Sequence, residues 1–163
     1  ARYSGRVALH VVPFTEMQME IYQHCPPDHG TIMLRRAMMQ IAERIARQQD
    51  CGALATGEAV GQVASQTLES LASTEDGIDL PILRPLIGFD KDEIIERARR
   101  IGTYETSILP YEDCCTIFTP RNPVIHPKVA DMRRSQSRVE NWEELLRKAL
   151  SATERRMAEP LEE

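Results

Sequence analysis

Residues 51–70, CGALATGEAVGQVASQTLES, contain the most informative pattern of the sequence. The short apolar run at 53–56 has the length of a strand and is bounded by glycine on both sides. Small polar residues follow it, among them Gln66. A buried strand that ends at a glycine and opens into small polar residues is typical of a ligand crevice in an open α/β sheet. Gly57 would let a ligand approach the backbone because it has no Cβ, although many such turns contain glycine for steric reasons alone.

Strand and helix patterns alternate along the rest of the chain. Residues 6–12 form a near-continuous apolar run before a proline, which predicts a buried parallel strand. A further short strand is expected at 80–83. Helices are predicted at 15–24, 31–49, 91–101 (after a capping-box pattern at Asp90 and Glu93) and 137–158. This alternation indicates an α/β fold with a mostly parallel sheet.

The helix at 31–49 has the clearest periodicity. Its core stripe is predicted to consist of Leu34, Met38, Ile41 and Ile45. Arg36 lies roughly opposite this stripe and is therefore expected to face solvent. Arg35 falls on the flank of the stripe, beside small residues. From that position its side chain could either reach into a groove or extend along the surface with its charged end in water.

Composition and charge narrow the class of protein. The 163 residues are enough for one domain, and a net charge of -5 argues against strong unaided binding of nucleic acid. The sequence has no apolar run of about 20 residues, the length that a membrane span needs. No export signal is visible, and the four cysteines do not have the spacing of a disulfide framework. We therefore expect a cytoplasmic protein with reduced thiols.

A second candidate site lies in the long irregular segment 103–127. It contains the adjacent pair Cys114 and Cys115, preceded by two acidic residues. A thiol that attacks a substrate or carries sulfur should lie in an accessible loop, where it can be deprotonated. The alternative is a pair of small buried residues, since cysteine is often buried. A zinc site with His126 is rejected because it lacks both a Cys-x-x-Cys pair and a fourth ligand.

Three motifs in the same order resemble the tRNA 4-thiouridine synthetases, the tRNA uracil 4-sulfurtransferases that are also named as thiamine-biosynthesis sulfur-transfer proteins. The motifs are TGEAVGQVASQTLES at 56–70, LRPLIGFDK at 83–91 and EDCCTIFTP at 112–120. The resemblance runs from about residue 6 to residue 128. It implies a three-layer α/β sandwich of the adenine-nucleotide alpha-hydrolase type, also called the PP-loop type.

The resemblance also implies site residues and partners. The nucleotide contacts of the family carry over onto Arg35, Gly57 and Gln66. Cys115 aligns with the family cysteine that handles sulfur, and Cys114 is its expected helper. The implied reaction uses ATP and Mg²⁺ to adenylate a uridine of tRNA, after which sulfur from a persulfide, supplied by a cysteine desulfurase, replaces the C4 oxygen. Sulfur transfer for thiamine thiazole synthesis is a second implied role. No metal-binding residue is assigned.

The chain departs from the family pattern at its N-terminal side. The phosphate-cradling Ser-Gly-Gly-x-Asp-Ser sequence is absent, as are the domains that grip tRNA. We therefore interpret residues 1–163 as a partial PP-loop domain that is incomplete at its N-terminus and is expected to bind ATP weakly and not to thiolate tRNA alone. Two alternatives stay open: a PP-loop adenylating enzyme with another acceptor, and a non-catalytic module that forms a homodimer through its terminal helices, for which the burial of Trp142 in a single chain is the discriminating observation.

Overall fold

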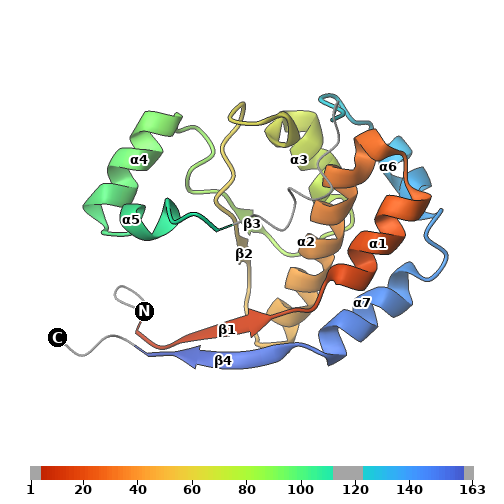
Figure 1. Ribbon diagram of the computed structural model, residues 1–163, viewed down its shortest axis with the longest axis horizontal. Coiled ribbons are helices and arrows are strands. Elements are labelled where there is room, and N and C mark those ends of the chain that lie inside the picture. Colours follow the sequence, from red (N-terminus) through yellow and green to blue (C-terminus); the bar gives the residue numbers. More distant parts are fainter. Residues whose placement is uncertain (1–4, 112–122, 160–163) are drawn as a thin grey trace.

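Helix α2 occupies the centre of the computed structural model, which describes residues 5–111 and 123–159 (Figure 1). The elements in chain order are β1 (Val7–Val11), α1 (Thr15–His24), the 3-10 helix η1 (Pro27–His29), α2 (Gly30–Gln48), β2 (Leu54–Ala55), the 3-10 helix η2 (Ala64–Gln66), α3 (Leu68–Glu75), β3 (Ile82–Leu83), α4 (Lys91–Arg100), α5 (Tyr104–Ser107), α6 (Val129–Gln136), α7 (Trp142–Ser151) and β4 (Glu154–Ala158). In these residues no helix is long and apolar enough to cross a membrane.

The core forms where α1, α6 and α7 pack against α2. Residues from all four helices are buried in one cluster: Met17, Ile21, Ile32, Met33, Leu34, Ala37, Ile41, Met132, Trp142, Leu145 and Leu146. Trp142 is 4% exposed in the single chain, and its indole N–H donates to Gln40 Oε1 at 2.8 Å. Trp142 therefore belongs to the core and gives no support to the alternative of a homodimer built on the terminal helices.

The prediction that Arg36 faces solvent is wrong. Its side chain is 3% exposed, and it donates hydrogen bonds to the carbonyl of Ser73, to Gln136 Oε1 (3.1 Å from Nη2) and to Asp76 Oδ2 (3.0 Å). The physical reason is that α3 and α6 cover the polar side of α2, while α1 and α7 cover the other side. Met38, predicted to lie in the core, is 37% exposed instead.

The strands form two separate pairs in the described residues. Strands β2 and β3 are parallel, with Leu54 opposite Ile82, as predicted for the sheet. Strand β1 pairs with β4 in antiparallel register, with Val11 opposite Glu154. The expectation of a buried parallel strand at 6–12 is therefore wrong, and Leu9 is 53% exposed. The α/β class itself is confirmed.

The C-terminal segment differs from the single helix predicted at 137–158. Helix α6 ends at Gln136, so Ser137 closes that helix instead of opening the next one. Helix α7 begins at Trp142 and buries the predicted apolar face, but the chain then forms β4. All five residues of β4 are exposed, and its sequence ERRMA has no apolar alternation that would predict a strand. The pairing with β1 therefore determines its conformation.

The helix predicted after the capping-box pattern at Asp90 and Glu93 is confirmed as α4. The Asp90 carboxylate accepts a hydrogen bond from Glu93 N, and the Glu93 carboxylate accepts one from Asp90 N, both at 2.9 Å. This capping box begins the helix at the predicted place. The helix ends before Gly102, whose φ of +73° favours glycine. Figure 1 shows α4 and α5 on the side of β2 and β3 away from α1 and α7.

The buried ion pair of Arg36 generates a stability prediction. Replacing Asp76 with alanine should lower the free energy of unfolding by about 3 kcal/mol, because it leaves a buried cation without its carboxylate. Hydrogen bonds from Arg133, and then from Arg36, hold the pKa of Asp76 below its usual range. The stabilisation should thus be complete above about pH 4, the usual pKa of an unfolded aspartate, and disappear as the pH falls below it.

Urea denaturation of the wild-type and D76A chains across this pH range measures the difference. The control is Asp79→Ala, because the Asp79 side chain is 88% exposed and lies 3.5 Å from Arg47. It should cost less than about 0.5 kcal/mol. Equal losses in the two variants, or a difference that persists at acid pH, would contradict the prediction.

Candidate functional site

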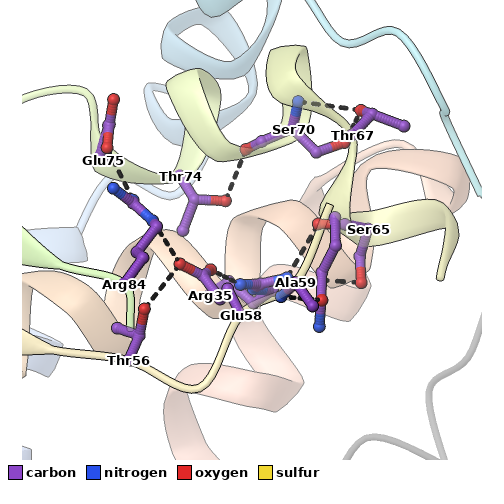
Figure 2. Close-up of polar contacts among 11 residues, drawn as sticks. Arg35, Thr56, Glu58, Ala59, Ser65, Thr67, Ser70, Thr74, Glu75 and Arg84 are labelled. Atoms are coloured by element: carbon purple, nitrogen blue, oxygen red, sulfur yellow. Dashed lines mark hydrogen bonds and ion pairs between the residues drawn. The ribbon is translucent and has the colours of Figure 1, made fainter. Parts of the chain in front are cut away.

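Polar side chains gather where the parallel strands β2 and β3 end (Figure 2). Thr56 and Glu58 follow β2, and Arg84 directly follows β3. Arg35 reaches the same place from α2. The carboxyl ends of parallel strands share one edge of the sheet, which is the usual position of ligand crevices in α/β proteins. These polar side chains therefore lie at the strand ends, where the sequence predicts a ligand crevice.

Glu58 is the centre of this cluster. Its side chain is 7% exposed and forms ion pairs with Arg35 Nη2 and, at 2.8 Å, with Arg84 Nε. The hydroxyl of Thr56 donates to the same carboxylate at 2.8 Å. Arg84 also pairs with Glu75 at 2.7 Å. The cluster thus alternates two guanidinium groups with two carboxylates, which balances its charge.

Arg35 lies at the edge of the cluster with its charged end inside the protein. Its Nη1 donates to the carbonyl oxygen of Ser65 at 2.8 Å and lies 3.4 Å from the Ser65 hydroxyl. Burial first, and the nearby positive charge of Arg84 second, lower the pKa of Arg35. An arginine remains charged at neutral pH despite such a shift. Of the two positions open to Arg35, the structure therefore shows the one that reaches into a polar site.

Gly57 and Gln66 frame the loop between β2 and η2. Gly57 is exposed, and a Cβ added to it would meet no atom within 4 Å. A side chain at this position would therefore not clash with the described residues. The side chain of Gln66 accepts a hydrogen bond from Ala59 N at 2.9 Å, and its carbonyl accepts one from Gly61 N at 3.1 Å. Gln66 thus fixes the loop through both its side chain and its backbone carbonyl.

Cys114 and Cys115 lie outside the described residues, so only the first of the two candidate sites is described by the structure. Glu58 and Arg84 were missed in the sequence. A signal for them existed, since each follows a predicted strand within a few residues, at the edge where ligands bind. No group of three or more histidine, cysteine, aspartate or glutamate residues that could hold a metal ion occurs in residues 5–111 and 123–159.

Comparison with known proteins gives consistent matches. The family model described as "Thiamine biosynthesis protein (ThiI)" matches residues 1–141. A protein of Acetivibrio thermocellus named "Probable tRNA sulfurtransferase" is 54% identical over 154 residues, covering 94% of this chain and 39% of its own length. A protein of Agathobacter rectalis with the same name is 52% identical over 155 residues, with the same coverage.

A solved structure supports the fold. The crystal structure of a 4-thiouridine synthetase–RNA complex with bound ATP superposes with a TM-score of 0.89 at 41% identity. The match covers 94% of this chain and 40% of that protein. The present chain therefore spans about two fifths of the length of the proteins that it resembles.

The position of Gln66 generates a prediction for the loop. Replacing Gln66 with alanine removes the acceptor of the Ala59 amide, so the exchange of that amide hydrogen with solvent should accelerate about 10-fold. Hydrogen exchange followed by NMR measures the rate. Gln62→Ala, a change at an exposed position of the same segment, is the control and should leave the rate unchanged. Equal exchange rates at Ala59 in wild type and Q66A would contradict the assignment.

Proposed function

Because the chain belongs to the thiamine biosynthesis protein (ThiI) family, we propose that it is part of a cytoplasmic enzyme that replaces the C4 oxygen of a uridine in tRNA with sulfur, giving 4-thiouridine. The names of its relatives and the RNA-bound synthetase that shares its fold support this activity. The net charge of -5 leaves the grip on tRNA to basic surface outside the chain.

The polar site at the strand ends supplies the proposed ATP contacts. Arg35 places a positive charge at the edge of the cluster, which suits a phosphorylated nucleotide, and we assign Gly57 as a backbone contact that carries no side chain. Gln66 holds the intervening loop in shape. The described residues form no carboxylate cluster for a metal, and Mg²⁺ would enter mainly through the phosphates of ATP. Bound ATP in the 4-thiouridine synthetase of the same fold is the observation that carries this assignment.

The chemistry requires activation before sulfur arrives. A carbonyl oxygen is a poor leaving group, so transfer of AMP from ATP to the C4 oxygen, with release of pyrophosphate, converts it into a good one. The outer sulfur of a persulfide, supplied by a cysteine desulfurase, then attacks C4, and AMP leaves. A second thiolate attacks the inner sulfur, which breaks the S–S bond, forms a disulfide and leaves the outer sulfur on C4. We assign Cys115 as the thiol that handles sulfur, either as nucleophile or as disulfide partner to the persulfide, and Cys114 as its helper.

Two acceptors other than the uridine of tRNA are compatible with an adenylation step. The family description favours sulfur transfer for the thiazole of thiamine as a further role of the same site. An adenylating enzyme with an unrelated acceptor is the alternative. The adjacent cysteines favour sulfur transfer over amidation, because an amidation reaction needs no thiol pair.

The nucleotide site is tested with Arg35→Ala in the full-length protein that contains this chain. Loss of a charge-assisted hydrogen bond should weaken ATP binding about 10-fold, as measured by isothermal titration calorimetry. Arg47→Ala is the matched control, because Arg47 lies on the same helix with its side chain half exposed. Unchanged ATP affinity in R35A would refute the proposed site.

The thiol assignment is tested with Cys115→Ser in the same protein. The hydroxyl cannot carry or reduce a persulfide, so 4-thiouridine should no longer form, as measured by mass spectrometry of digested tRNA. Cys51→Ser is the control, because Cys51 is an exposed cysteine of the described chain. Thiolation that continues at the wild-type rate in C115S would refute the role of Cys115.

A further inference from the structure

We propose that Glu58 is a positioning residue. It holds the Arg35 guanidinium at the proposed ATP site, and Arg84 in turn holds Glu58. This inference rests on the proposed function, because it assigns the residues that hold a proposed ATP contact in place. The evidence is the bridge itself: one buried carboxylate pairs with both arginines (Figure 2).

The contacts of Glu58 come from three separate segments. Arg35 lies on α2, Thr56 follows β2, and Arg84 follows β3. A carboxylate held by three partners in a buried position has little rotational freedom. The arginine that it binds is fixed in turn, and a fixed guanidinium loses less conformational entropy when a phosphate or ribose binds.

The charge balance makes this bridge necessary. Arg35 and Arg84 are close enough for the charge of Arg84 to act on Arg35. Without the Glu58 carboxylate, the two cations would repel each other in a partly desolvated site. The Arg35 guanidinium would then move towards solvent and away from the place where the nucleotide binds.

Two other roles for the cluster fit the structure less well. A latch that Glu58 releases when a phosphate arrives would have to be mobile, but its side chain is 7% exposed and held by three partners. Arg84 could instead bind the anion directly. The cavity of about 460 Å³ beside Arg84 has Glu75 among its lining residues, and the Glu75 carboxylate already pairs with Arg84 at 2.7 Å. The anion is therefore expected on the Arg35 side.

The experiment uses the full-length protein that contains this chain, with Glu58→Gln and Glu58→Asp. E58Q removes the charge at nearly constant shape and should raise KM for ATP about 10-fold while kcat changes less than about 2-fold. E58D keeps the charge and should recover part of the loss. A lower KM in E58Q would show a releasing latch, and an unchanged KM would show no link to the nucleotide; either result overturns the proposal.

A double-mutant cycle separates positioning from general damage to the fold. If Glu58 acts through Arg35, then E58Q introduced into the R35A variant should change KM for ATP less than about 2-fold further. Equal effects of E58Q in both backgrounds would overturn the proposal.

Glu43→Gln is the matched control. Like Glu58, Glu43 is a buried glutamate that pairs with an arginine. Glu43 lies on α2, pairs with Arg47 at 2.8 Å and accepts hydrogen bonds from the backbone amides of Asp79 and Leu80. E43Q should lower the thermal midpoint without raising KM for ATP, and a rise equal to that of E58Q would overturn the proposal. The experiments distinguish failure of the proposed ATP site from failure of the role of Glu58. An unchanged ATP affinity in R35A refutes the ATP site. A weaker affinity in R35A together with an unchanged KM in E58Q refutes only the role of Glu58.

Discussion

Two consecutive arginines on α2 must each pair with a carboxylate, and these two ion pairs determine which segments pack around the helix. Arg35 and Arg36 point about 100° apart around the helix axis. Glu58, after β2, pairs with the first, and Asp76, after α3, pairs with the second. A buried cation without a carboxylate would cost several kcal/mol, so both segments are tied to the same helix. One helix thus connects the apolar core with the candidate site.

The parts of the fold that the sequence predicted correctly depend on local signals. The helix at Thr15–His24 and the capping box before α4 are set by residues within a few positions of each other. The parallel pairing of β2 and β3 follows from the helical segment between them. Each of these features could be read without knowing what the chain contacts elsewhere.

The failures have a common physical cause in long-range contacts. Periodicity identified the apolar face of α2 but could not show that other helices cover its polar face, where Arg36 is buried. Strand β4 has no apolar alternation, and its conformation depends on pairing with β1 near the other end of the chain. In the site, the flanking position of Arg35 left two interpretations open, and the resemblance to the 4-thiouridine synthetases assigned it to the nucleotide. Glu58 was missed although it closely follows a predicted strand, because its burial depends on pairing with Arg35 and Arg84, which are distant in the sequence. The cysteine pair stays a prediction.

The burial of Trp142 has a practical consequence for spectroscopy. It is the one tryptophan of the sequence, so intrinsic tryptophan emission comes from a single place, the contact of α7 with α2. Gln40, its hydrogen-bond partner, lies about 140° around α2 from Arg35. The fluorophore therefore reports the docking of α7 and the integrity of the core, and it is separated by the helix from the polar cluster. A change in its emission spectrum on adding a nucleotide would indicate that binding at the polar cluster alters the contact of α7 with α2.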